Sequence, residues 1–213
     1  MLRAVQDDWQ PGGPRQRLTA ELLDEYEERL CAHRVPVVEH LRPGLSEDEI
    51  SSLIAELDLI APAEALAWWS WHDAAGEQIA LGCRFLSLED GVLKTLSRRD
   101  LARELVDRRA GPEWWTEDLL WKQSWLVSLD GDGTDMAIDC DVDPGATSPV
   151  HWADAWRQPE EAHEPLTQSM GDLVTRWIAA LDGGSMYYDG EYAMWQARDV
   201  PGAPRMYQSG RWR

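Results

Sequence analysis

The sequence predicts a single α+β domain, in which N-terminal helices precede a mostly antiparallel sheet and further helices flank that sheet. Apolar residues recur at helical spacing before residue 72 and after residue 166, and they alternate at period two in several segments between. The chain has 213 residues, 44% of them hydrophobic, which is enough to bury a core. We expect the folded domain over 18–190, between a flexible lead-in at 1–17 and a tail at 191–213.

The first predicted helix covers 18–33. Its apolar face consists of Leu22, Leu23, Tyr26 and Leu30. Glutamates occupy the other faces, as in an amphipathic surface helix. Such an acidic face is either simply solvated or docks a basic partner. The lead-in before it holds two prolines and two glycines at 11–14, which disfavour regular structure.

The next two helices have clear start signals. Ser46 and Glu49 form a capping-box pattern, which predicts a helix over 46–58. Its apolar stripe consists of Ile50, Leu53, Ile54 and Leu57. Pro62 is suited to the first helical position, and we therefore expect a second helix over 62–71.

The middle of the chain predicts a strand, a turn and a helix. Alternating apolar residues indicate a strand over 79–88, and the Asp-Gly dipeptide at 90–91 is typical of a turn. Ser97 is a suitable N-cap for a helix over 97–108. The inward face of that helix should hold Leu101, Leu105 and Val106.

Basic residues gather on this helix, against the charge of the chain as a whole. Between Lys94 and Arg109 there are six basic and three acidic residues. The interpretation that we favour is a solvated face with internal ion pairs, namely Asp100 with Arg103 and Glu104 with Arg108. The alternative is a local patch that binds an anion or a partner.

The stretch 125–145 predicts a wide hairpin with acidic turns. Period-two patterns indicate strands over 124–129 and 135–141, and a third strand is expected near 149–152. The Asp-Gly-Asp-Gly run at 130–133 supplies turn chemistry. A calcium loop counted from Asp130 or from Asp139 lacks the required glycine and glutamate, so we expect solvated turns without metal.

A last helix is predicted over 167–181. Its apolar face consists of Met170, Leu173, Val174, Trp177 and Leu181. The glycines at 183–184 are a suitable stop signal. The arginine-rich tail beyond them either pairs with the protein's own acids or is disordered.

Several of these motifs together resemble the SUKH superfamily, over about 42–190. The run Arg-Pro-Gly-Leu-Ser-Glu-Asp-Glu-Ile at 42–50, its helix, the proline-started helix and Trp-Ser-Trp-His-Asp at 69–73 resemble the opening of these domains. The tryptophan-led hairpin and the closing helix with Tyr-Tyr-Asp at 187–189 resemble their second half. The superfamily includes fungal cell-wall-assembly regulators and many bacterial toxin-immunity proteins. The acidic first helix lies outside its pattern, and the basic insert is longer than the pattern implies.

The residues themselves indicate no catalytic constellation and no cofactor. The chain has no GxSxG, P-loop or GxGxxG motif, and its best-placed histidines are His72 and His151. Its three cysteines are far apart and form no CxxC pair, which is typical of free thiols in a reducing compartment. The N-terminus has no apolar signal core. We expect a cytoplasmic protein that is not an enzyme.

The net charge of −19 favours a basic protein partner over nucleic acid or a membrane surface. The resemblance implies an immunity protein that binds and neutralises a cognate toxin, often a nuclease. The alternatives are a regulatory scaffold of the same fold and a divalent-metal hydrolase that uses the acids of 130–143. The residues expected to bind the partner are Asp130, Asp132, Asp135, Asp139, Asp141, Trp69 and Trp125.

Overall fold

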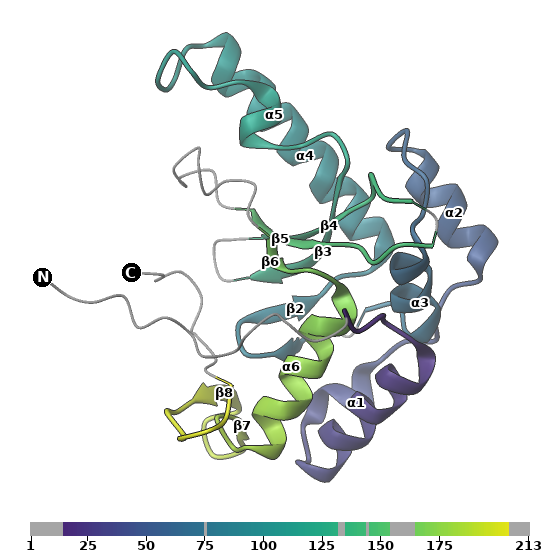
Figure 1. The fold of residues 1–213 in the computed structure, drawn as a ribbon, viewed down its shortest axis with the longest axis vertical. Coiled ribbons are helices and arrows are strands. Elements are labelled where there is room, and N and C mark those ends of the chain that lie inside the picture. The colour runs from purple at the N-terminus through teal and green to yellow at the C-terminus, as the bar shows by residue number, and fades with distance from the viewer. Residues whose placement is uncertain (1–14, 75, 132–134, 144, 154–164, 205–213) are drawn as a thin grey trace, which may run out of the picture.

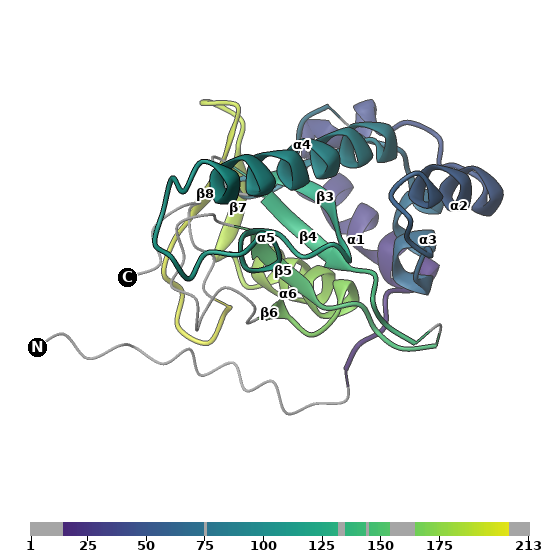
Figure 2. The same cartoon turned by 90° about the horizontal axis from the view of Figure 1, so that it is seen from above.

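The computed structural model describes residues 15–74, 76–131, 135–143, 145–153 and 165–204. It confirms the α+β class: six α-helices in these residues surround a six-stranded antiparallel sheet, and a separate two-stranded sheet follows (Figure 1). Helix α4 lies across one face of the large sheet, and α6 and α1 lie on the opposite side (Figure 2). No helix among the described residues has the length and apolar character needed to cross a membrane.

The large sheet is a meander in which each strand pairs with its neighbour in sequence. Its strands are β1 (Gln78–Ala80), β2 (Cys83–Phe85), β3 (Trp125–Gly131), β4 (Asp135–Asp139), β5 (Val150–Ala153) and β6 (Pro165–Thr167). The strands predicted at 124–129, 135–141 and 149–152 are therefore confirmed to within two residues. The register sets Trp125 opposite Asp139 and Asp130 opposite Asp135, and it shifts once between Val127 and Leu129.

The N-terminal helices follow the sequence pattern closely. They are α1 (Ala20–Ala32), α2 (Glu47–Ala55) and α3 (Ala63–Trp71), with a 3-10 helix at Pro36–His40 after α1. The four predicted apolar residues of α1 are all buried, and both halves of the capping box at Ser46 and Glu49 are present. We predicted that Pro62 is the first helical residue of α3. In the structure it is the N-cap, one position earlier.

The prediction for 79–108 was partly wrong. The strand expected at 79–88 is the short hairpin of β1 and β2, and helix α4 (Leu88–Asp107) begins directly after it. Its N-cap is Ser87, whose hydroxyl accepts a hydrogen bond from the Asp90 N–H, so neither the turn at 90–91 nor the cap at Ser97 exists.

The reason for this error is that Gly91 has a packing role. A Cβ at this position would lie 2.5 Å from the carbonyl oxygen of Val127, so only glycine lets α4 approach β3 so closely. Thr95, one turn later, accepts a hydrogen bond from the Val127 N–H at 3.0 Å. The other buried residues of α4 are Leu88, Val92 and Ala102. Leu101, by contrast, is exposed, and Leu105 and Val106 are half-buried.

The folded domain extends further toward the C-terminus than predicted. Helix α6 (Met170–Asp182) has its predicted apolar face buried, and Thr167, the first residue of the range predicted for it, belongs to β6. Strands β7 (Met186–Asp189) and β8 (Met194–Ala197) form the second sheet, so regular structure extends past the boundary at 190. At the other end, the Gln16 N–H donates to the Asp172 carboxylate at 2.9 Å, while 1–14 lie outside the described residues.

The core has one large and one small part, on opposite faces of the sheet. The large part lies between the sheet and α1, α3 and α6, and contains Trp68 packed on Phe85 with ring centroids 4.6 Å apart. The small part lies under α4 and contains Trp125, Val127 and Ala137. The abundance of tryptophan is thus used largely for packing.

The close approach of α4 to β3 gives a direct test. Gly91→Ala should destabilise the fold by about 1–3 kcal/mol, the usual range for overpacking, because the new methyl group meets the Val127 carbonyl oxygen. Helix propensity alone predicts the opposite sign, a gain of about 1 kcal/mol. Urea unfolding of this variant and of Gly190→Ala, where a Cβ meets nothing within 4 Å, measures the difference. A stabilised Gly91→Ala variant would contradict the packing described here.

Candidate functional site

The carboxylates of the hairpin are held by cations of the same chain. The Lys94 ammonium lies 2.6 Å from the Asp130 carboxylate and 2.8 Å from that of Asp135. Arg98 Nε lies 2.6 Å from the second oxygen of Asp135, and Arg84 lies 3.5 Å from Asp130. Because Lys94 and Arg98 are one helical turn apart, both reach the hairpin from the same side of α4.

This arrangement changes the interpretation of the acidic turn. The side chain of Asp135 is only 1% exposed, so it is not the solvated steering carboxylate that the sequence suggested. A buried carboxylate is stable only when it is paired, and Lys94 and Arg98 provide that pairing. Asp130 is 23% exposed and also paired. Asp132 lies outside the described residues.

Asp139 and Asp141 have different surroundings. Asp139 is buried on the face of the sheet that α4 covers, where its carboxylate lies 3.8 Å from His151 Nε2. The His151 ring stacks on Trp125 with centroids 4.7 Å apart. Asp139 also accepts a hydrogen bond from the Asp141 N–H at 3.0 Å, which stabilises the turn after β4. Only the Asp141 side chain is exposed to a partner.

The two tryptophans expected to bind the partner are both core residues. Trp69 is buried, and its Nε1 donates to the Leu86 carbonyl at 3.3 Å. Trp125 is buried on the other face of the sheet, where its ring meets that of Trp121 edge to face. Of the six predicted site residues that the structure describes, Asp141 is thus exposed, Asp130 is partly exposed, and the others are buried.

The ion pairs predicted along α4 are confirmed. Arg103 lies 3.0 Å from Asp100, and Arg108 lies 2.8 Å from Glu104.

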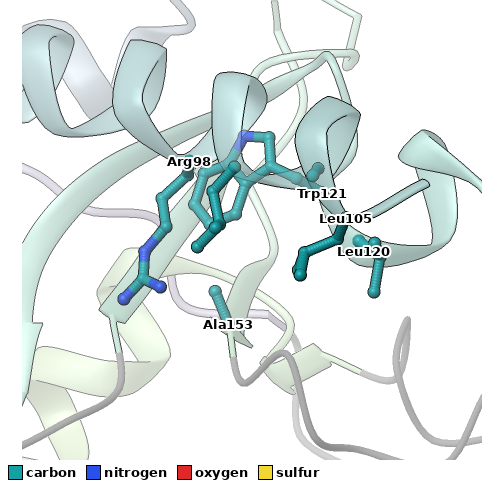
Figure 3. Close-up of a pocket in the computed structure, with 7 residues that line it drawn as sticks. Arg98, Leu105, Leu120, Trp121 and Ala153 are labelled. Carbon is teal, nitrogen blue, oxygen red and sulfur yellow. The ribbon is translucent and has the colours of Figure 1, made fainter. Parts of the chain in front are cut away.

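A small pocket between α4, α5 (Glu117–Leu120) and β5 has a volume of about 20 Å³ (Figure 3). That is room for about one water molecule, too little for a small-molecule ligand. The labelled side chains around it are Arg98, Leu105, Leu120, Trp121 and Ala153.

Sequence reasoning missed Glu64, a buried carboxylate in the first turn of α3. It accepts backbone hydrogen bonds from Leu18 at 2.7 Å and Ser148 at 2.6 Å, and from Met170 and Gly171 at the start of α6. Burial raises the pKa of this carboxyl, and the four backbone N–H groups oppose that shift. A glutamate in the first turn of a helix is common, so no local signal indicates this role.

The remaining surface is strongly acidic in two places. On α1, Glu21, Asp24 and Glu28 are exposed, and on α2 so are Glu47 and Asp48. No basic side chain of the described residues lies within 4 Å of these five carboxylates. Within the part of the chain that the structure describes, no ion pair therefore offsets their charge.

Cys140 and His72 are both held by contacts within the fold. Burial, together with the nearby Asp139, raises the pKa of the Cys140 thiol to about 12, so the reactive thiolate is scarce at neutral pH. His72 lies just beyond α3, with Nδ1 2.8 Å from the Arg42 carbonyl and Nε2 3.2 Å from Glu27. Within the described residues, no group of three or more His, Cys, Asp or Glu side chains is placed to hold a metal ion.

Comparison with known proteins adds no family. No protein-family model matches this chain, and no curated protein matches it.

The pairing of Asp135 predicts a specific stability effect. Arg98→Met should destabilise the fold by about 1–3 kcal/mol, below the 3–5 kcal/mol of a fully broken buried pair, because Lys94 still neutralises Asp135. The matched control is Arg108→Met, which removes an exposed ion pair and should change stability by less than about 1 kcal/mol. Urea unfolding measures both. Equal effects from the two variants would show that the buried pair has no special role.

Proposed function

We propose that this protein is a non-enzymatic protein-binding domain of the immunity type, which binds and neutralises a basic protein, in the simplest case a nuclease toxin. The observation that carries the proposal is the distribution of unpaired charge. The chain has a net charge of −19, and the exposed carboxylates of α1 and α2 have no cation of the described residues beside them.

The field of these carboxylates favours one class of partner. A surface rich in negative charge speeds the association of a positively charged protein, and it repels nucleic acid and anionic lipid. An ion pair within the chain contributes little to this field, because its two charges largely cancel at a distance. We therefore assign the steering of the partner to the acids of α1 and α2 rather than to Asp130 and Asp135.

The resemblance to SUKH domains supports the same proposal, because their immunity members bind toxins. A regulatory scaffold of this fold is the second possibility, and it would bind a partner without inhibiting it. A metal hydrolase at the hairpin finds less support, because the Lys94 ammonium occupies the space between Asp130 and Asp135 where a metal ion would compete.

The test uses the partner that the full-length protein captures from extracts of its source cells at low salt. Surface plasmon resonance should show an association rate that falls at least tenfold as the Debye length shrinks from about 30 Å to about 8 Å, with a smaller change in dissociation. The captured protein's own activity, nuclease activity first, should be inhibited at stoichiometric concentration. Binding without inhibition would favour the scaffold, and an association rate indifferent to salt would contradict the proposal.

Two variants separate unpaired from paired charge. Glu21→Gln combined with Asp24→Asn removes two unpaired carboxylates and should slow association at low salt. The control, Glu104→Gln combined with Arg108→Gln, removes a carboxylate together with its cation and should leave the rate unchanged. Equal slowing by both pairs would show that the unpaired charge is not what attracts the partner.

A further inference from the structure

A cleft of about 520 Å³ opens between two connections of the chain that are far apart in sequence. One wall is the α2–α3 connection at 57–62, and the other is formed by 123–124 and 140–142, at the ends of β3 and β4. Its volume falls within the range of ligand and side-chain binding sites. Its apolar lining consists of Leu57, Leu59, Ile60, Ala61, Pro62 and Val142.

Ile60 is the most exposed large apolar side chain of the described residues, at 82%. An isolated exposed isoleucine is ordinary, but this one stands at the edge of an apolar cleft. A partner that covered it would bury both the side chain and the lining beneath it. Burial of that kind is how an apolar anchor contributes to an interface.

The charge of the cleft is set by two aspartates on facing walls. Asp58 follows the end of α2 and Asp141 follows the end of β4, and both are exposed. No basic side chain of the described residues lies within 4 Å of either carboxylate. The C-terminus of α2 adds partial negative charge on the same wall.

Arg99 is the cation of this cleft, and the chain itself uses it. Its guanidinium donates to the Leu57 carbonyl at 3.0 Å and to the Gln123 carbonyl, and so joins the two walls. Burial lowers the pKa of Arg99, and the nearby Asp58 opposes that shift. The cleft therefore holds two carboxylates against one guanidinium, and this excess has the same sign as the net charge of −19.

We propose that this cleft is the docking site for an extended basic segment of the protein partner. A lysine or arginine of that segment lies between Asp58 and Asp141, and a neighbouring apolar side chain packs on Ile60 and Val142. The inference rests on the proposed function, and it assigns the contact, whereas the acids of α1 and α2 steer the encounter. Charge complementarity and the exposed isoleucine select this occupant over an anionic small molecule.

The probe is a short capped peptide in which lysine and leucine alternate, titrated into the ¹⁵N-labelled full-length protein. The control peptide has glutamate in place of lysine. The lysine peptide should shift the amide resonances of 57–61 and 140–142, and the glutamate peptide should not. Asp58→Asn combined with Asp141→Asn should weaken the lysine peptide at least fivefold, and so should Ile60→Ser.

These variants are chosen to leave the fold intact. Asparagine tolerates the left-handed backbone of Asp58 (φ 58°), and Ile60 and Asp141 are exposed, so the melting temperatures should equal that of the wild type. Glu21→Gln combined with Asp24→Asn removes two carboxylates outside the cleft and should leave the affinity for the peptide unchanged.

The outcomes distinguish this inference from the proposed function. If the lysine peptide shifted amide resonances of α1 and not those of the cleft, and lost affinity for the Glu21→Gln, Asp24→Asn variant, the cleft would not be the docking site. Steering of the partner by acidic residues would still hold. Binding of the glutamate peptide in the cleft would overturn the assigned charge. If neither peptide bound, the docking site would also be overturned. The salt dependence of partner association tests the proposed function independently.

Discussion

The buried carboxylate of Glu64 is the constraint on which the arrangement of the helices depends. Its two oxygens accept hydrogen bonds from the backbone of Leu18, Ser148, Met170 and Gly171, which belong to three separate segments. Each of these N–H groups would otherwise be buried without a partner, at a cost of about 1–3 kcal/mol. One side chain of α3 thus fixes the entry to α1, the loop before β5 and the start of α6.

A second constraint operates on the other face of the sheet. Gly91 and Thr95 bring α4 against β3, and this closeness lets Lys94 and Arg98 reach the hairpin carboxylates. The basic helix and the acidic hairpin therefore neutralise each other. The exposed carboxylates of α1 and α2 and those at the rim of the cleft have no such cation beside them among the described residues, so the fold decides which charges are paired.

The parts predicted from sequence are those set by local pattern. The buried face of α1 and the capping box of α2 depend on residues within a few positions of one another, and both were correct. The start of α4 was wrong because Asp-Gly at 90–91 is a turn signal, and the role of Gly91 is visible only from Val127. The burial of Asp135 and the bonds of Glu64 likewise depend on residues far away in the sequence.

The most direct test of this account is Glu64→Gln. The amide group would turn an N–H donor toward the two backbone N–H groups that share one oxygen, either Leu18 and Gly171 or Ser148 and Met170. We therefore expect a loss of at least about 2 kcal/mol in unfolding free energy and faster hydrogen exchange at Leu18 or at Ser148. The control, Glu56→Gln at an exposed position, should stay within about 0.5 kcal/mol of the wild type. A Glu64→Gln variant as stable as that control, with both amides still protected, would contradict the central role of this carboxylate.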